Sequence, residues 1–413
     1  MLHQELVAIF HAGLVAASAQ AALSGRLPSA APRGRTIVLG CGKAAAAMAE
    51  VAATELPGEV TGCIVTRKGH RARAPTGGIA VIEASHPVPD AASLAAGRRL
   101  RALAATARAG DRVVFLISGG GSALLVDPIP GLSLAEKARI TDHLVRSGAA
   151  IADINCVRRH LSQVKGGRLA AAARAAAGDM HSFVMSDVVG DDPATVASGP
   201  SIASPFEPER AIAILLASGW RVEDSLAGLI RAAVPPPVPP HPVHLVATAR
   251  TMLDAASKAA SLRGWRVVRI GDDLTGDAAA TGRDHAALAL RHLAAGGPCL
   301  LVSGGELTVA VRAKGGRGGP NLEYLAGLMA ALPEGVPIAA LACDSDGIDG
   351  TEDNAGGWFD AAHRAPAQEC EGALAANRTH DLFARRGTLV VTGPTRTNVN
   401  DMRLIAVRGS PSA

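Results

Sequence analysis

The sequence predicts an α/β protein of two domains, on three observations. Its 413 residues exceed what one hydrophobic core usually holds. Short apolar runs of strand length alternate with Ala-rich helical stretches, as in parallel sheets covered by helices on both faces. The segment 234–242 carries six prolines in nine residues, which exclude a helix or a central strand and mark a linker.

The alternation predicts the elements of both halves. In the first half we expect strands at 36–39, 62–66, 79–83, 113–117 and 183–187, and helices at 44–54, 91–109, 134–150 and 166–177. In the second half we expect strands at 244–248, 265–270, 300–302, 309–313, 338–343, 389–392 and 404–407, and helices near 250–262 and 278–295. The expected domains are 1–236 and 237–413, facing each other across a ligand cleft.

The N-terminal segment predicts an amphipathic helix, because Leu2, Leu6, Ile9 and Leu14 recur at helical spacing. A secretory signal is the weaker alternative, since no Lys or Arg precedes the apolar run and Glu5 does. No run reaches transmembrane length without Gly, Pro or charge, so we expect no membrane partner.

Composition excludes several classes of protein. Aromatic residues make up only 2% of the chain, which argues against stacking platforms for single-stranded nucleic acid. The 41 basic and 37 acidic residues are well mixed, with no basic stripe for DNA or membranes. The six cysteines form no C-x-x-C pair, which disfavours zinc or disulfides and indicates a reducing, cytoplasmic compartment.

Glycine and serine follow several predicted strands and supply the main functional signal. Small residues at a strand end leave backbone N–H groups accessible, and such groups beside a helix start hold anions. The candidate phosphate-binding residues are Gly40, Gly42, Ser118, Gly119, Gly120, Gly121, Ser122, Ser303, Gly304, Gly305 and Glu306. A further strand end, at Thr392 and Gly393, has the same character. The pattern favours a phosphate-handling enzyme.

The run G-C-G-K-A-A at 40–45 matches the relaxed dinucleotide pattern G-x-G-x-x-A. A nicotinamide site needs an acid at the end of the next strand, but Thr66, Arg67 and Lys68 stand there. Basic residues suit a phosphate instead. Lys43 at a helix start opposes the local dipole, so an anion is expected to compensate its charge; a simply solvated lysine is the alternative.

Two clusters of carboxylates follow predicted strands, in 186–192 and 344–354. Asp187, Asp192 and Asp344 are the candidate metal ligands, because hard oxygen donors with few His or Cys favour Mg²⁺ over zinc. Asp residues that merely cap turns are an equally simple interpretation.

Cationic stretches supply candidates for substrate binding. Arg158 and Lys165 lie in a dense basic segment, and Arg317 lies in a glycine-rich loop just before Asn321. Arg317 has the geometry to hold a moving phosphoryl group or a carboxylate bidentately. Solvated helix faces and loops are the alternative.

Ten short motifs, in order, resemble the bacterial glycerate 2-kinases with a C-terminal MOFRL domain, some of which carry the name hydroxypyruvate reductase. The resemblance runs from about residue 5 to 408. The motifs are GCGKA (40–44), SHPVPD (85–90), SGGGSAL (118–124), N-x-VRRHLS-x-x-KGGRL (155–169), SDVVGDD (186–192), SGPS (198–201), SGGE (303–306), GRGGPNLE (316–323), DSDGIDG (344–350) and TGPTRTNVND (392–401).

The resemblance implies a Rossmann-like N-terminal domain, a smaller α/β C-terminal domain and a site between them. It implies transfer of phosphate from ATP, with Mg²⁺, to the 2-hydroxyl of D-glycerate. Lys43 matches the family's active-site lysine, and Arg317 best matches its loop arginine. Many relatives have Arg where this chain has Pro320, a departure from the family pattern three residues beyond Arg317.

From the residues we expect Lys43 and Arg317 to stabilise the moving group, with Asp187 as a catalytic or metal-binding carboxylate. Arg158 or Lys165 would hold the glycerate carboxylate, beside Asn321. A hydroxypyruvate reductase is the second interpretation and a non-catalytic sugar-acid sensor the third. The oligomeric state stays open, with a homodimer as one alternative.

Overall fold

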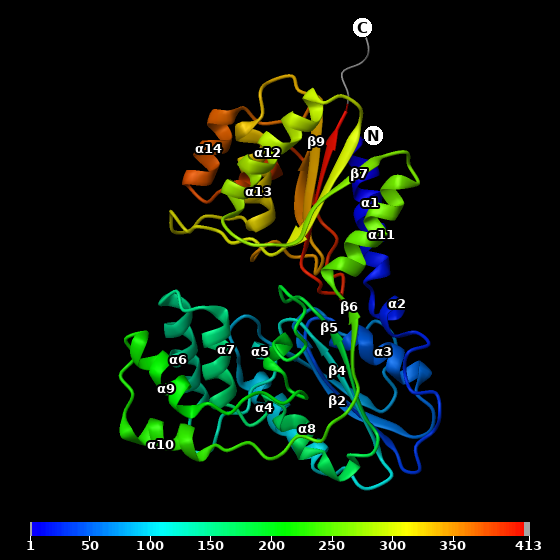
Figure 1. Ribbon diagram of the computed structural model, residues 1–413, viewed down its shortest axis with the longest axis vertical. Coiled ribbons are helices and arrows are strands. Elements are labelled where there is room, and N and C mark those ends of the chain that lie inside the picture. The colour runs from blue at the N-terminus through cyan, green and yellow to red at the C-terminus, as the bar shows by residue number, and fades with distance from the viewer. Residues whose placement is uncertain (1, 409–413) are drawn as a thin grey trace. The chain divides into compact units, whose positions relative to one another are not determined.

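The computed structural model describes residues 2–408, which divide into two compact units (Figure 1). The parallel-sheet unit is Ala22–Val246; the mixed-sheet unit joins residues 2–21 to those from Ala247 onward. This division differs from the expected 1–236 and 237–413 at both ends, because the first helix belongs with the C-terminal half. That 1–236 and 237–413 are domains that fold independently stays a prediction.

The parallel-sheet unit contains one six-stranded sheet in the order β3-β2-β1-β4-β5-β6. Its strands are β1 (Thr36–Cys41), β2 (Val60–Arg67), β3 (Ile79–Ala84), β4 (Arg112–Ser118), β5 (Met180–Met185) and β6 (Val243–Ala247). The strands β1 to β5 pair in parallel, and all five strands expected in the first half are confirmed. The strand expected at 244–248 is confirmed as β6, and it joins this sheet.

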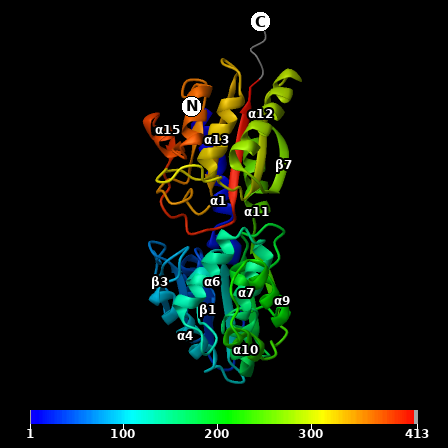
Figure 2. The ribbon, with the colours of Figure 1, turned by 90° about the vertical axis from the view of Figure 1, so that its left-hand side faces the viewer.

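Apolar side chains alternate along these strands, so each face of the sheet receives its own helices. Ile37, Leu39 and Phe115 share a buried cluster with residues of α4 (Ala91–Ala104) and α8 (Arg168–Ala172). The helix α3 (Ala45–Glu55) covers the opposite face (Figure 1). Four further helices, α6 (Leu134–Arg146), α7 (Ile151–His160), α9 (Pro208–Ala217) and α10 (Asp224–Ala232), pack around a separate core (Figure 2).

The mixed-sheet unit has the strand order β11-β10-β9-β12-β8-β7. Its strands are β7 (Arg266–Leu274), β8 (Cys299–Gly305), β9 (Ile338–Asp344), β10 (Gly356–Phe359), β11 (Leu389–Val390) and β12 (Asp401–Val407). Only β7 and β8 pair in parallel. The strand expected at 309–313 is wrong: the N–H groups of Arg312 and Ala313 donate to Asn377 Oδ1 instead of to a strand.

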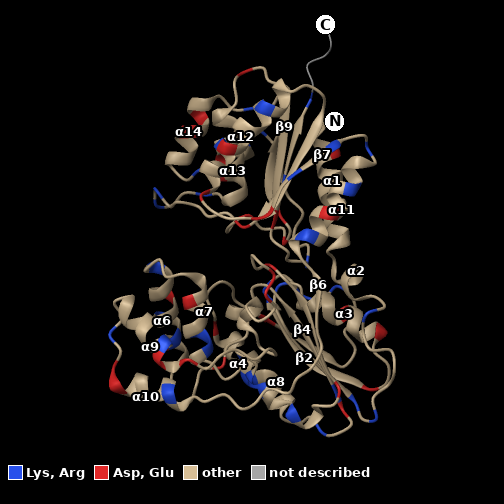
Figure 3. Ribbon diagram, viewed as in Figure 1, with Lys and Arg blue, Asp and Glu red and all other residues tan. Residues whose placement is uncertain are grey.

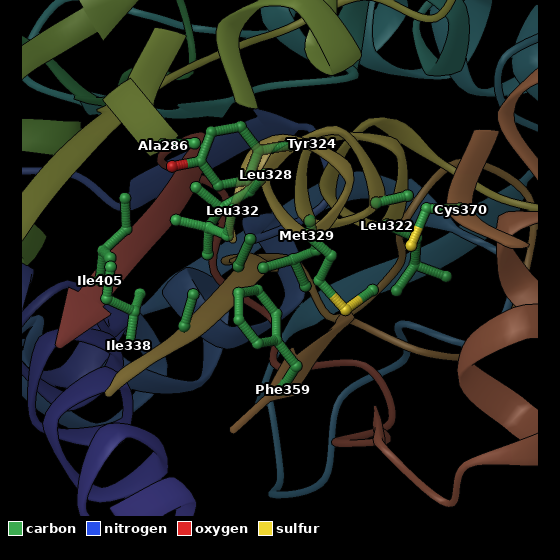
Figure 4. Packing of buried hydrophobic residues seen from close by; sticks show 14 of the residues in the cluster. Ala286, Leu322, Tyr324, Leu328, Met329, Leu332, Ile338, Phe359, Cys370 and Ile405 are labelled. Carbon is green, nitrogen blue, oxygen red and sulfur yellow. The ribbon is translucent and has the colours of Figure 1, made fainter. Parts of the chain in front are cut away.

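Two layers of helices cover this sheet. On one face lie α12 (Ala278–Ala294), α13 (Pro320–Ala331), α14 (Ala367–Ala375) and α15 (Thr379–Arg385); on the other lie α1 (Leu2–Ala16) and α11 (Ala249–Ser261). Figure 4 shows the first of these interfaces, where Leu328 and Met329 of α13 meet Ile338, Ile405 and Phe359 of the strands.

The first helical segment, Leu2–Leu23, has the length and hydropathy of a membrane span, but half of it is buried in the fold. Leu6 and Phe10 are fully buried, and Glu5 accepts a 2.7 Å hydrogen bond from Trp265 Nε1. These contacts are those of a core helix of the mixed-sheet unit. Acidic and basic residues are interspersed over both units (Figure 3), and all six cysteines are free and buried.

Candidate functional site

The strand order of the parallel sheet reverses between β1 and β4, and ligands of such sheets bind outside the carboxyl ends of the strands at that point. The GCGKA and SGGGS motifs occupy these two ends. Gly42 has φ +124°, and a Cβ there would lie 2.2 Å from Ser118 Oγ. Ser118 Oγ also accepts the N–H of Ala44 at 3.0 Å. The close approach of Gly42 to Ser118 and this hydrogen bond therefore hold the turn after β1 against the end of β4.

Lys43 lies at the start of α3, as expected, one residue before the N-cap Ala44, and its N–H donates to Gly119 O at 2.9 Å. The glycine loop at 118–122 approaches this lysine closely. A Cβ on Gly120 would lie 3.1 Å from Lys43 Cγ and 3.3 Å from His86 Nε2. A side chain here would have to displace the lysine and the histidine slightly, and Gly120 also has φ +76°, which favours glycine. The loop, Lys43 and His86 therefore lie close together at the switch point.

The loop residue Ser122 contacts two buried side chains, those of Ser198 and Lys165. Its hydroxyl lies 3.0 Å from Ser198 Oγ, which donates to Asn155 Oδ1 at 3.1 Å. Lys165 is fully buried, and its Nζ donates to Ser122 O and Leu125 O at 2.9 and 3.1 Å. Burial lowers the pKa of Lys165 to about 7. This placement is not that of a surface lysine open to a substrate.

Arg158 lies in the last turn of α7 and is half-buried. Burial lowers the pKa of its guanidinium. Within residues 2–408, no carboxylate lies within ion-pair distance of Arg158. A half-buried cation of this kind is suited to an external anion.

Asp187 and Asp192 follow β5 in the loop that the sequence singled out. Asp192 is exposed, and its Oδ1 accepts the N–H of Ala194 at 3.0 Å, so one oxygen is used within its own turn. Asp187 is half-buried. Groups of three or more His, Cys, Asp or Glu side chains placed for a metal do not occur in the part of the chain that the structure describes.

In the mixed-sheet unit, the carboxyl ends of β8 and β9 meet the start of β12. Asp401 is paired in register with Gly305 on one side and with Asp344 on the other. Arg403 is fully buried; its guanidinium donates to Asp401 Oδ2 at 2.6 Å and to Gly304 O and Gly305 O at 3.0 and 3.2 Å. A buried cation therefore fixes this second glycine strand end. Glu306, the next residue, is exposed.

Asn321 lies in the first turn of α13 and is fully buried. Its Nδ2 donates to Asp401 Oδ1 at 2.9 Å, and its backbone N–H donates to Asp349 Oδ1 at 2.9 Å. Asn321 Oδ1 and Ser303 Oγ are buried without a hydrogen-bond partner among residues 2–408. These two unsatisfied atoms mark this strand end as a place for a polar ligand.

Asp349 holds the N-terminus of α13, because its two oxygens accept the N–H groups of Asn321 and Leu322. Burial raises the pKa of Asp349 to about 7, and the charge of Asp401 adds to the effect. Asp344 ends β9, and its Oδ1 accepts the N–H of Asp346 at 2.8 Å.

Arg317 is about half exposed, at 53% for its side chain, and is held by acids. Its Nε donates to Glu352 Oε2 at 2.9 Å, and its Nη1 lies 3.8 Å from Asp381 Oδ1. Two carboxylates therefore compensate its charge. A catalytic role for Arg317 stays a prediction, and one that requires it to exchange these partners.

Sequence reasoning did not select Asn155, Ser198, Asp349, Asp401 or Arg403. All five lie in or beside motifs that carried the family resemblance, yet each has a polar side chain that the sequence pattern alone assigns to the surface. Pairing of distant segments buries them, as in the contact of Ser198 with Ser122.

The fold and these polar strand ends define a two-unit α/β protein with a glycine-rich end on each sheet. Two family models match the chain: a domain of unknown function, DUF4147, over residues 5–233, and the MOFRL family over residues 299–401. The chain belongs to the family of proteins that combine these two domains.

Named relatives span nearly the full length. The chain is 40% identical to a putative hydroxypyruvate reductase of Agrobacterium vitis, over 98% of this chain and 94% of that protein. It is 34% identical to the D-glycerate 2-kinase of Thermotoga maritima, over 89% of each. The crystal structure of glycerate kinase from Thermotoga maritima matches with a TM-score of 0.87 at 32% identity, over 98% of this chain and 99% of that one. The expected Rossmann-like architecture and the family are confirmed.

Proposed function

We propose that this chain is a D-glycerate 2-kinase. The γ-phosphorus of ATP forms a bond to the 2-hydroxyl oxygen of D-glycerate, its bond to the ADP oxygen breaks, and the hydroxyl proton leaves to a base or to water. The relatives named glycerate kinase support this reaction, since they match the chain along most of its length.

One structural observation carries the proposal: Lys43 and the 118–122 loop share the switch point of the parallel sheet, next to a β2 strand that ends in Arg67. Phosphoryl transfer depends on positioning and on neutralising charge. At the parallel sheet, the loop N–H groups and the Lys43 ammonium are proposed to position the phosphates and neutralise their charge. At the mixed sheet, the 303–306 strand end is proposed to do the same.

The remaining roles follow from burial and charge. Arg158, a half-buried cation without an ion-pair partner among residues 2–408, is proposed to hold the glycerate carboxylate. Asn321, with its unsatisfied buried oxygen, is proposed to orient a substrate hydroxyl. Residues of both units are thus proposed to be necessary for one reaction, in a cytoplasmic enzyme.

Mg²⁺, when bound, would neutralise charge on the nucleotide phosphates. The donor set fits this ion: Asp187, Asp192 and Asp344 offer hard oxygens, and Mg²⁺ commonly uses one or two carboxylates together with phosphates and water. A preformed group of three ligands is therefore not required, and none occurs in residues 2–408.

A hydroxypyruvate reductase is the second candidate, because two relatives bear that name. The β2 strand argues against it: β2 lies beside β1, as in dinucleotide sites, but ends in Arg67 instead of the acid that holds a ribose. In addition, Gly42, the second glycine of the G-x-G pattern, is explained by its close contact with Ser118. This glycine therefore does not by itself indicate a dinucleotide site.

The test incubates purified protein with D-glycerate, ATP and Mg²⁺, and separately with hydroxypyruvate and NADH. We expect ADP and 2-phosphoglycerate in the first reaction and no NADH loss in the second. Lys43→Ala should lower kcat/KM by about 30- to 1,000-fold, the effect of about 2–4 kcal/mol in the barrier. Lys258→Ala, at an exposed lysine of α11, is the control and should match wild type. NADH oxidation without ADP formation would refute the kinase.

A further inference from the structure

Lys165 contacts the glycine loop from inside the protein. The short helix α5 (Gly121–Leu124) begins within the loop, and its last carbonyl groups have no partners in the helix itself. Lys165 Nζ donates to two of these, Ser122 O at 2.9 Å and Leu125 O at 3.1 Å. The lysine is therefore hydrogen-bonded to the C-terminal part of the loop segment, at residues 122 and 125.

Lys165 has no acidic partner in the part of the chain that the structure describes. No ion pair of Lys165 occurs in residues 2–408, and its side chain is fully buried. The ionisable groups that interact with Lys165 supply no anion near neutral pH: burial raises the pKa of the Cys41 thiol to about 12, and Arg158 and Lys137 are bases. Burial lowers the pKa of this amine to about 7, so it is partly neutral near pH 7, and its two hydrogen bonds to Ser122 O and Leu125 O fix its position beneath the loop.

A second segment supports the same loop and is joined to the lysine's own segment. Gly166 N–H donates to Ser198 O at 3.1 Å, and Ser198 Oγ meets Ser122 Oγ at 3.0 Å. Ala197 and Ser198 have φ values of +54° and +61°, which residues other than glycine rarely adopt. Strain of this kind persists where the surroundings over-determine the backbone. The loop is therefore held from two sides.

We propose that Lys165 is a positioning residue, which holds the 118–122 loop in the conformation that receives the triphosphate of the nucleotide and does not itself contact the glycerate carboxylate. The inference rests on the proposed kinase function and assigns Lys165 a role different from the one expected from sequence.

The experiment compares Lys165→Met with Lys137→Met. Lys137 is the control: it is also a buried lysine, its pKa is lowered by burial and by the charges of Lys165 and Arg158, and its Nζ donates to a single carbonyl, Leu161 O at 3.1 Å, which lies outside 118–126. Steady-state kinetics are measured against both substrates. We expect Lys165→Met to raise KM for ATP about tenfold or more with KM for D-glycerate within twofold, and Lys137→Met to change neither KM beyond twofold.

Two readouts do not depend on catalysis. Hydrogen exchange of peptides covering 118–126 should accelerate about tenfold in Lys165→Met and stay unchanged in Lys137→Met, and binding of inorganic tripolyphosphate should weaken in parallel. Lys165→Gln keeps a hydrogen-bond donor and should give intermediate values; it replaces the Met variant if that variant does not fold.

Several results overturn the inference. A folded Lys165 variant with wild-type exchange in 118–126 and unchanged tripolyphosphate affinity would do so, and so would a selective rise in KM for D-glycerate. If the wild-type protein phosphorylates no glycerate, the proposed function fails separately, and the exchange and tripolyphosphate results still decide the role of Lys165.

Discussion

Three charged side chains, Lys165, Asp349 and Arg403, are at most 1% exposed, and each is hydrogen-bonded to the backbone beside a candidate strand end. Their burial distinguishes them from solvated charges. Sequence pattern could not predict it, because a charged residue in a polar segment has the same local signature whether it is exposed or covered by a distant segment.

Asp349 gives a prediction at this scale. Burial raises its folded-state pKa from 3.8 to about 7, so the folded protein binds this proton more tightly than the unfolded chain. Protonated Asp349 therefore contributes to the free energy of unfolding. This contribution is present in full below pH 3.8 and is lost as pH rises through 7, with a magnitude on the order of 4 kcal/mol. Asp349→Asn should remove that pH dependence.

The measurement is urea unfolding of wild type and Asp349→Asn at pH 5 and pH 8. Wild type should lose stability relative to the variant between these two values, since effects of all other groups cancel in the difference. Equal pH dependence in the two proteins would show that Asp349 is ionised in the fold over the whole interval.

At the scale of elements, glycine acts through close approach of strands and turns. Gly42 combines φ +124° with a backbone position that leaves no room for a Cβ, which would lie 2.2 Å from Ser118 Oγ. Gly42→Ala must therefore displace the β1 turn from β4, and we expect a loss of about 1–3 kcal/mol in unfolding free energy together with weaker nucleotide binding.

Gly228 is the control for that substitution. It lies on the exposed face of α10, where a Cβ would meet no heavy atom within 4 Å and the backbone is ordinary helix. Gly228→Ala should stabilise the protein by about 0.5–1 kcal/mol, because alanine loses less backbone entropy in a helix. Chemical denaturation of both variants gives the comparison; stabilisation by Gly42→Ala would contradict the strand-end geometry.

The same physics explains which elements could be predicted. The apolar runs of β1, β4 and β5 are fully or largely buried, so composition alone marks them. The run at 309–313 is also apolar in part, but Asn377 takes its N–H groups, a long-range contact that no local pattern contains. The glycine strand ends were predictable as a motif. Lys165 was also a candidate from sequence, but the burial of Lys165 and Arg403 and their hydrogen bonds to the strand ends were not predictable.

At the scale of the whole molecule, chain order and spatial grouping differ. The sequence correctly predicts an amphipathic first helix, but nothing local indicates its partner. The helix α1 joins the mixed-sheet unit, where Phe10 is fully buried and Glu5 bonds Trp265. The unit is thus closed by residues from both ends of the chain, and its stability depends on a segment that the whole of Ala22–Val246 separates from it in sequence.

Phe10→Ala tests this grouping. Removing a buried aromatic ring costs about 3–5 kcal/mol, and the loss should fall on the mixed-sheet unit alone. Tryptophan fluorescence separates the units, because Trp220 lies in Ala22–Val246 whereas Trp265 and Trp358 lie in the other unit. In a Trp220→Phe background, Phe10→Ala should move the urea transition to lower concentration. In a background lacking Trp265 and Trp358, the transition reported by Trp220 should stay in place; an equal shift there would mean that α1 stabilises the parallel-sheet unit as well, or that the two units unfold as one.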